Sequence, residues 1–389
     1  MSVFIRRNLI YLLSKNSSFA YKSQSYVSLH FFSTFDEKEN QPVISPTVSD
    51  LLLKKHKFSP QAASKIASVL TQIKDPEKSD SILLFLKESG FSNTQLEKIV
   101  ICRPRLLSAS LENSIKPKIK IFQDLGFSAH DIALIVTRVP SILHRSANNS
   151  LIPALKKLTG LLGCNAEVAR LLKHCGWFLT DDLEKTMVPN IEFLKSCGIS
   201  MDSIFSFIYN YPRCILVKPE ILRKCVEKAH EMGVNRDYKS YIYAIGIIAS
   251  RSDEAWELKL QAFRNVGFSE SDIKTLFRKA PIVFAVSGEK IKAIKEVLLA
   301  TGKYDLSCIV TSPKSLTVSI EKRYKPRLQV LSILEKKNLI KEWPSLGRVF
   351  YLTDVFFLKN YVAPYLNEIG GERERAINVK DLIKELGFQ

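Results

Sequence analysis

Two kinds of helix-ending residue recur along this chain at nearly constant intervals, and this repetition limits the folds open to it. Pro104, Pro140, Gly176 and Pro212 follow one another at steps of 36 residues. A second series, in which a glycine precedes an apolar residue, advances in steps of 34 to 37 residues through Gly90, Gly126, Gly163, Gly198, Gly233 and Gly267. Such a period is the signature of a solenoid, whose units bury their apolar faces only against their neighbours.

Each of these landmarks predicts a boundary between helices. The first proline lacks an N–H group and clashes with the preceding turn, so it ends a helix. In four units a second proline follows thirteen residues later, at Pro117, Pro153, Pro189 and Pro326. There it suits the first turn of the next helix, which the glycine then closes in a left-handed conformation. The predicted unit is a helix, a proline turn with a short apolar segment, a second helix and a glycine cap.

The pattern predicts an all-α protein, because alternating β-branched runs joined by Asn-Gly or Asp-Gly turns are nearly absent. The fold class is therefore an α-solenoid. The fifth unit departs from the repeat, since Ala249 stands near the expected proline and the segment 237–250, DYKSYIYAIGIIAS, is unusually aromatic. We expect this unit to be distorted but still helical.

The charge of the chain points to a polyanionic partner. Its formal net charge is +18 and its sequence pI is about 9.5, which suits nucleic acid or an anionic membrane surface. No stretch is apolar enough over about 18 residues to span a membrane. The seven scattered cysteines form no C-x-x-C pair, which indicates free thiols in a reducing compartment and no metal site. No nucleotide-binding, metalloprotease or hydrolase motif occurs, so we expect a binding protein without a cofactor rather than an enzyme.

The first 35 residues have the composition of an organellar transit peptide. They contain four basic residues, eight serines and no acidic residue. The sequence FFST near the end of this segment favours the mitochondrion, with the chloroplast as the alternative. We expect a linker over 36–50, a repeat array over 51–336 and an aromatic-rich C-terminal cap over 337–389.

The doubled proline and closing glycine, followed from about Lys55 to about Leu334, resemble the repeats of the mitochondrial transcription termination factor (mTERF) family. Pentatricopeptide and tetratricopeptide repeats have a similar period, but their two-helix units do not require the proline pair. The resemblance implies stacked helical triplets in a curved left-handed superhelix whose basic concave face holds nucleic acid. It also implies a role in organellar transcription termination or initiation, or in RNA maturation.

A cation recurs near the first proline of most units, which predicts a basic ladder that follows a phosphate backbone. The candidates are Arg103, Arg138, Lys173, Arg213, Arg278 and Lys314. The alternative is structural, because Lys and Arg also favour helix C-termini, where they complement the helix dipole. The two alternatives are open for each single residue, and the basic character of the whole chain favours the ladder for the set.

The densest basic cluster is the segment EKRYKPRLQ, in which cations surround an aromatic ring. It adds Lys322, Arg323, Tyr324, Lys325 and Arg327 to the predicted nucleic-acid-binding residues. Arginine suits phosphate contacts and tyrosine suits base stacking. The alternative is a solvated helix start with Tyr324 half-buried.

These observations predict a monomeric organellar protein that binds double-stranded DNA or RNA in a basic groove and regulates transcription termination. Splicing or another step of RNA maturation is the alternative on the same surface. A solenoid that holds a protein partner is the alternative of another class. We also expect organellar protein partners, and no membrane association.

Overall fold

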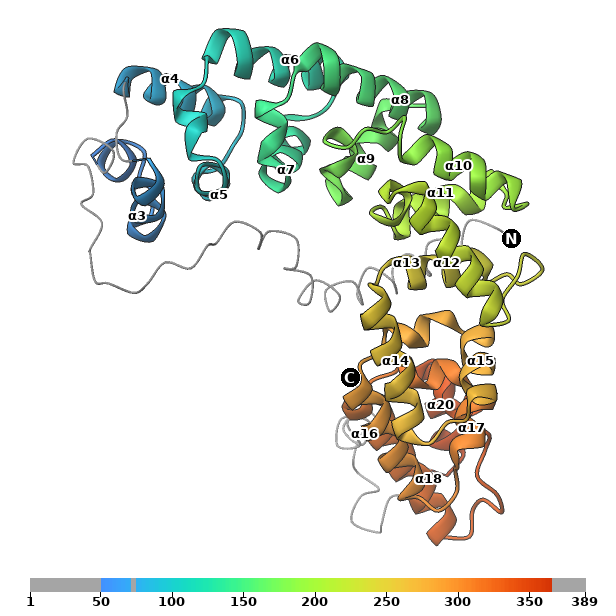
Figure 1. Ribbon diagram of the computed structural model, residues 1–389. Coiled ribbons are helices and arrows are strands. Elements are labelled where there is room, and N and C mark those ends of the chain that lie inside the picture. Colours follow the sequence, from blue (N-terminus) through green and yellow to red (C-terminus); the bar gives the residue numbers. More distant parts are fainter. Residues whose placement is uncertain (1–49, 71–74, 366–389) are drawn as a thin grey trace, which may run out of the picture.

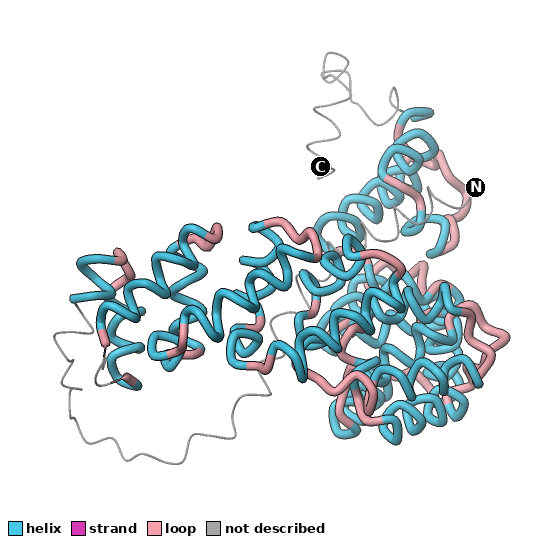
Figure 2. The backbone as a smooth tube through the Cα atoms, turned by 90° about the horizontal axis from the view of Figure 1, so that it is seen from above, coloured by secondary structure: helices cyan, strands magenta, loops and turns pink. Residues whose placement is uncertain are grey.

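Paired helices stacked along an arc form the whole of the described structure (Figure 1). The computed structural model describes residues 50–70 and 75–365. Within these ranges the chain contains helices, turns and loops but no strand (Figure 2). The predicted all-α solenoid is confirmed. The predicted transit peptide lies outside the described residues, as do nearly all of the linker and residues 366–389 of the cap.

Each repeat has a first helix, which in most repeats begins shortly after the glycine that closes the preceding repeat. In the N-terminal half these helices line the inside of the arc (Figure 1). They are α3 (Pro60–Val69), α5 (Asn93–Cys102), α7 (Ala129–Arg138), α9 (Asn165–His174), α11 (Met201–Asn210), α13 (Tyr241–Ala249), α15 (Glu270–Lys279), α17 (Leu306–Thr311) and α19 (Leu346–Tyr351).

The second helix of each repeat lies on the outside of the arc in that half (Figure 1). These helices are α4 (Pro76–Glu88), α6 (Lys116–Asp124), α8 (Ile152–Leu162), α10 (Met187–Ser196), α12 (Pro219–Glu231), α14 (Asp253–Val266), α16 (Gly288–Leu299), α18 (Lys325–Lys336) and α20 (Asp354–Tyr361). Two short elements, η1 (Asp50–Lys55) and η11 (Ala363–Tyr365), stand at the ends of the described array.

A short 3₁₀ turn joins the two helices in most repeats, at the place where the first proline was predicted to end a helix. The turns are η2 (Pro104–Ser108), η4 (Pro140–His144), η6 (Gly176–Leu179), η7 (Cys214–Leu216), η8 (Pro281–Ala285) and η9 (Pro313–Thr317). The residue before the proline leaves the helical region, as at Arg103 with φ −141° and ψ 70°. The turn then buries two apolar side chains, Leu106 and Leu107 in η2, in the core.

The second proline lies in the first turn of its α-helix, as the sequence predicted, at Pro117, Pro153 and Pro326. In three repeats a wide π-helical turn precedes it, over η3 (Leu111–Ile115), η5 (Ala147–Leu151) and η10 (Ile320–Tyr324). The residue before Pro117, Lys116, donates its N–H to the carbonyl of Leu111, five residues earlier. The wider turn gives the ring room inside a continuous helix, because a normal turn would place a carbonyl against it.

The predicted caps are present. All the glycines of the second series adopt positive φ, for example 79° at Gly126. The following helix begins at a serine in several repeats, and Ser128 accepts a hydrogen bond from the N–H of Asp131 at 3.1 Å. The glycine and serine together turn the chain from one repeat into the next.

Polar side chains of the second helices hydrogen-bond the 3₁₀ turns of the next repeat. Lys118 donates to the carbonyl of Leu143 at 2.6 Å. Asn190 donates to the carbonyls of Ile215 and Val217 at 2.9 and 2.8 Å. These carbonyls end a short helical turn and have no partner within it, so we name the contacts cross-repeat bonds. They fix the position of each turn relative to the repeat before it.

The fifth repeat is helical, as predicted, but it lacks the 3₁₀ turn. Most of α13 is buried, and its Gly246 lies directly against the ring of Tyr211. A Cβ at this position would come within 2.5 Å of Tyr211 Cδ2, so only glycine fits there. In place of the missing turn, the side chain of Arg251 links this repeat to the next by donating hydrogen bonds to the carbonyls of Ile247 and Phe284. The array changes direction in this region (Figure 1).

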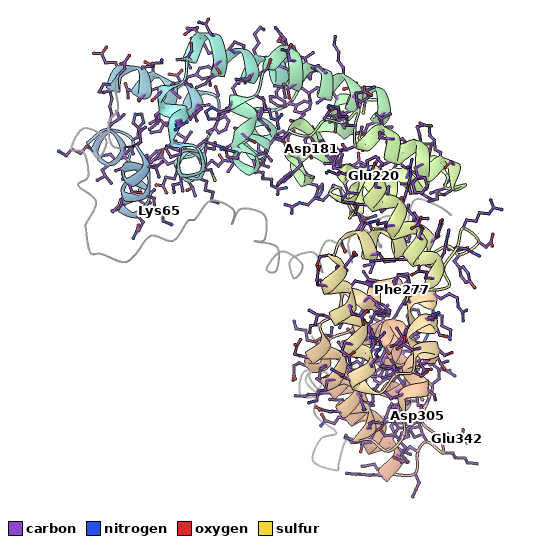
Figure 3. All side chains as sticks on the ribbon, viewed as in Figure 1. Lys65, Asp181, Glu220, Phe277, Asp305 and Glu342 are labelled. Carbon is purple, nitrogen blue, oxygen red and sulfur yellow. The ribbon has the colours of Figure 1, made fainter. Side chains whose placement is uncertain are left out.

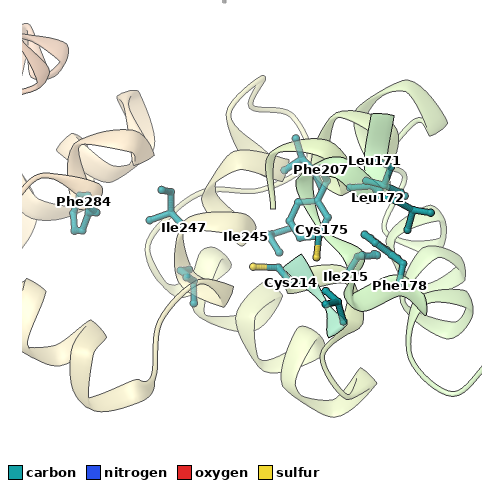
Figure 4. Packing of buried hydrophobic residues seen from close by; sticks show 14 of the residues in the cluster. Leu171, Leu172, Cys175, Phe178, Phe207, Cys214, Ile215, Ile245, Ile247 and Phe284 are labelled. Carbon is teal, nitrogen blue, oxygen red and sulfur yellow. The ribbon is translucent and has the colours of Figure 1, made fainter. Parts of the chain in front are cut away.

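The core continues through this bend without a break. Figure 4 shows Cys175, Phe178 and Ile215 packed between the helices of neighbouring repeats, with Cys214 and Ile245 beside them. All five side chains are buried. Burial raises the pKa of the Cys214 thiol to about 12 and also raises that of Cys175, so both thiols are protonated and serve packing.

Candidate nucleic-acid interface

The 3₁₀ turns and the C-terminal ends of the first helices form one edge of the array, which is interrupted at the fifth repeat because that repeat has no 3₁₀ turn. We call this the turn edge and define it by η2, η4, η6, η7, η8 and η9 with the last turns of α5, α7, α9, α11, α15 and α17. Each first helix ends here because proline, or Gly176 in one repeat, stops it. Since the repeats are in register, residues at equal positions follow one another along the edge.

Four of the predicted ladder residues are exposed on the turn edge, namely Arg103, Arg138, Arg213 and Lys314. Lys173 and Arg278 are partly exposed. The structure thus places all six at the same edge, as the repeat predicted. Whether they contact nucleic acid stays a prediction.

On this edge, cations of one repeat act on the histidines of the next repeat. Burial lowers the pKa of His144, and the positive charges of Arg103 and Lys118 lower it further. Burial likewise lowers the pKa of His174, which also feels Arg138 and two cations of its own helix. Each histidine is therefore acted on by an arginine of the preceding repeat, in addition to the larger effect of its own burial.

Two of the six ladder residues are engaged by the protein itself. Lys173 forms an ion pair with Asp131 of the preceding repeat, at 2.8 Å between Nζ and Oδ1. Arg213 lies over the ring of Trp177, with 5.0 Å between its guanidinium carbon and the ring centroid. The first contact reduces the charge that Lys173 offers to a ligand, whereas the second leaves the charge of Arg213 unbalanced.

The structure adds aromatic and cationic residues that the sequence did not single out. Trp177 is 40% exposed in η6, at the position directly after the residue that ends the first helix. The guanidinium of Arg170 lies 4.5 Å from the ring centroid of Tyr209, in the next repeat. Arg145, just after η4, donates to the carbonyl of Thr180. Trp177 stands among apolar residues in CGWFLT, a context typical of core, so only its exposure reveals it.

These residues gather near the middle of the arc. Figure 3 labels Asp181, which lies just beyond η6, and Glu220 at the start of α12. Burial raises the pKa of Asp181, while the charge of Arg145 opposes the rise. In the C-terminal half of the turn edge, Phe277 and Phe284 are fully buried and expose no ring.

The prediction that Tyr324 and Arg327 bind nucleic acid is wrong for this structure, because both side chains have 0% exposure. Tyr324 donates its hydroxyl to the carbonyl of Ser315 at 3.1 Å, and its ring lies 3.9 Å from that of Phe350. Arg327 forms a cross-repeat bond with the carbonyl of Leu352 at 3.0 Å and others with the carbonyl of Val349 and the carboxylate of Asp354.

The remaining residues of the predicted cluster are at the surface, but their charges are partly balanced. Lys325 forms an ion pair with Glu321 at 2.8 Å, and Arg323 lies 3.7 Å from Asp354. Lys322 is exposed. The π-helical turn η10 sets the direction of these side chains and rotates Tyr324 into the core. The strongest candidate surface is therefore the N-terminal half of the turn edge.

No helix within residues 50–70 and 75–365 is both long and apolar enough to cross a membrane. The protein-family model named mTERF matches residues 47–234 and 242–358, and the gap between the two matched segments falls at the start of α13. This match covers more than half of the chain and extends past residue 336 into the predicted cap.

Two curated relatives come from Arabidopsis thaliana. Transcription termination factor MTERF8, chloroplastic, is 22% identical over 68% of this chain and 54% of its own length. Transcription termination factor MTERF15, mitochondrial, is 24% identical over 50% of this chain and 44% of its own length. The chain spans about half the length of these relatives, and they belong to two different organelles. The fold and the matches together show that the chain belongs to the mTERF family, whose members are generally non-enzymatic, nucleic-acid-binding regulators of transcription.

Proposed function

We propose that this chain is an organellar regulator of gene expression that holds DNA or RNA along the N-terminal half of its turn edge. The observation that carries the proposal is the series of exposed arginines within two residues of the proline that ends the first helix, with Arg103, Arg138 and Arg213 in three different repeats as its main members. Phosphate contacts of this kind fix the register of a nucleic acid without reading its sequence.

The electrostatics of the edge support this proposal. Burial is the main cause of the lowered pKa values of His144 and His174, and repulsion by Arg103 and Arg138 respectively lowers them further. A polyanion would relieve this repulsion, and arginine suits phosphate because its planar guanidinium donates two parallel hydrogen bonds. On the opposite surface of the same repeats, the exposed cations Lys120 and Lys195 are paired with acidic neighbours, which reduces the charge they offer to a polyanion.

The relatives' names support an organellar role in transcription termination, in the mitochondrion or in the chloroplast. We propose the mitochondrion, because the basic, acid-poor first 35 residues favour it. Regulation of transcription is the first candidate process. A role in RNA maturation is the second, and the exposed ring of Trp177 favours it because flat rings bind unpaired bases.

The test is a triple variant, Arg103→Gln with Arg138→Gln and Arg213→Gln, compared with the unchanged full chain. The matched control removes three exposed charges from second helices of the same half, by Lys120→Gln, Lys156→Gln and Lys195→Gln. We expect the first variant to bind duplex DNA and RNA at least about tenfold more weakly, and the control to bind within about threefold of the unchanged chain. Equal losses in the two variants would contradict a binding surface at the turn edge.

A further inference from the structure

The search for a further site leads to Trp177, the one large aromatic side chain that the described residues expose on the turn edge. An indole ring buries a large apolar area when it is inside a protein, so a ring that stays 40% exposed leaves a flat apolar face in water. Phe178 and Leu179, the next two residues of the turn, are fully buried. The turn thus exposes the ring of Trp177 to solvent and buries the two apolar side chains that follow it.

Main-chain bonds hold the turn that carries this ring. The carbonyl of Trp177 accepts hydrogen bonds from the N–H groups of Thr180 and Asp181, at 2.8 and 3.0 Å, and from the hydroxyl of Thr180 at 3.1 Å. Arg145 of the preceding repeat binds the carbonyl of Thr180. The ring is therefore presented by a backbone that these hydrogen bonds hold in place.

Gly176 explains why this repeat differs from its neighbours. Its ideal Cβ would lie 2.7 Å from Cγ2 of Val139, the residue that precedes the proline of the repeat before. A proline or alanine at this position would force the two repeats apart. The glycine lets η6 sit close against the preceding repeat.

Arg213 occupies the same position in the next repeat, directly after Pro212, as Trp177 does after Gly176. Its guanidinium carbon lies over the indole, 5.0 Å from the ring centroid, and the tryptophan is still 40% exposed. The arginine side chain is exposed and has a charge that its aromatic neighbour does not neutralise. The pair combines a stacking surface with a phosphate-binding group, which is the arrangement that suits a single strand.

We infer that Trp177 and Arg213 form a stacking site for an unpaired nucleobase, so that this surface prefers single-stranded RNA or DNA to the duplex of the same sequence. The inference rests on the proposed function, because the turn edge must first hold the phosphate backbone. The base stacks on the exposed indole, and Arg213 contacts the adjoining phosphate. In a duplex the bases stack on one another, so the site gains nothing from them.

The test uses the full chain and three probes: a single-stranded RNA of about 12 nucleotides, its duplex, and an abasic strand of the same length. The variants are Trp177→Ala and Trp177→Phe. Trp343→Phe is the matched control, since Trp343 lies in the C-terminal part of the array and donates to Glu335 at 2.9 Å. We expect Trp177→Ala to bind the single strand about 10-fold more weakly and the duplex within about twofold, and Trp177→Phe to retain most of the affinity.

Tryptophan emission gives an independent measure, because the chain has three tryptophans and Trp256 is buried. The single strand should quench the emission of the unchanged chain and of Trp343→Phe, but not that of Trp177→Phe. Unchanged single-strand affinity in Trp177→Ala, equal loss for the duplex, or equally tight binding of the abasic strand would overturn the stacking site alone. Failure of every probe to bind the unchanged chain would overturn the proposed function as well.

Discussion

Lys118 and Leu143 form a hydrogen bond that joins two neighbouring repeats, with 2.6 Å between the lysine Nζ and the carbonyl oxygen. The lysine is 5% exposed, and its other hydrogen-bond partner is the hydroxyl of Ser114 at 2.8 Å. A buried ammonium group without a carboxylate is costly, and burial lowers its pKa accordingly. We infer that the hydrogen bond from Lys118 to the carbonyl of Leu143 compensates for this cost.

Replacement of this lysine should therefore destabilise the array. In Lys118→Met the carbonyl of Leu143 loses its donor while the apolar stem is kept, and we expect the free energy of unfolding to fall by about 1–3 kcal/mol. Lys120→Met, on the same helix, changes a side chain that is 72% exposed and should alter stability by less than about 0.5 kcal/mol. Denaturant unfolding followed by circular dichroism measures both, and equal stabilities would show that the cross-repeat bond contributes nothing.

Arg327 should behave as a structural residue and not as a ligand contact. Arg327→Met leaves the carbonyls of Val349 and Leu352 and the partly covered carboxylate of Asp354 without their donor, so we expect a loss of about 3 kcal/mol in stability. Arg323→Met removes a longer, more exposed contact to Asp354 and should cost less than about 1 kcal/mol. Thermal unfolding distinguishes the two, and a larger loss in Arg323→Met would contradict this assignment.

Two glycines offer a matched pair of alanine substitutions with opposite expected signs. Gly246→Ala drives a methyl group into the ring of Tyr211, and such overpacking costs about 1–3 kcal/mol. Gly160→Ala places a methyl group in open space on α8 and should stabilise that helix by about 0.5–1 kcal/mol. Unfolding midpoints that move in the same direction would mean that the bend at α13 is more adaptable than the contact indicates.

His56 should make the N-terminal repeat sensitive to acid. It is 0% exposed, its Nε2 lies 2.9 Å from Asp80, and burial is the main cause of its lowered pKa. Because the unfolded chain takes up this proton near pH 6.5 and the folded chain resists it, stability should fall as pH drops below about 6.5. Hydrogen exchange in α3 and α4 at pH 7 and pH 5.5 measures the effect. His56→Gln should lessen the difference, and an undiminished difference would assign it to other groups.

The sequence was sufficient to predict the repeated helices, because proline and glycine act on their own backbone and need no distant partner. The boundaries at the first proline and the left-handed glycines follow from this local chemistry. The π-helical turns do not, since they result from fitting Pro117, Pro153 and Pro326 inside continuous helices. An extra residue per turn changes which side chains face inward, and this is why Tyr324 was misplaced.

The candidate site, like the fold, could be predicted from the sequence only in part. The position of the exposed arginines follows from the repeat, as Arg103 and Arg138 lie beside the prolines that end their helices. The role of Arg327 could not be predicted, because the carbonyls that it binds belong to a segment more than twenty residues further along the chain. Trp177 was missed for the opposite reason, since its apolar neighbours suggested core and only the structure reveals its exposure.

The most direct test of the turn edge as a phosphate-binding surface is the salt dependence of binding by the full chain and by the Arg103, Arg138 and Arg213 triple glutamine variant. For duplex DNA the logarithm of the binding constant should fall with the logarithm of salt concentration, and removal of three phosphate contacts should make the slope shallower by about 2–3. Binding of the unchanged chain should remain measurable at about 150 mM salt. An equal slope in the two proteins, or loss of all binding by the unchanged chain at that salt concentration, would contradict the account.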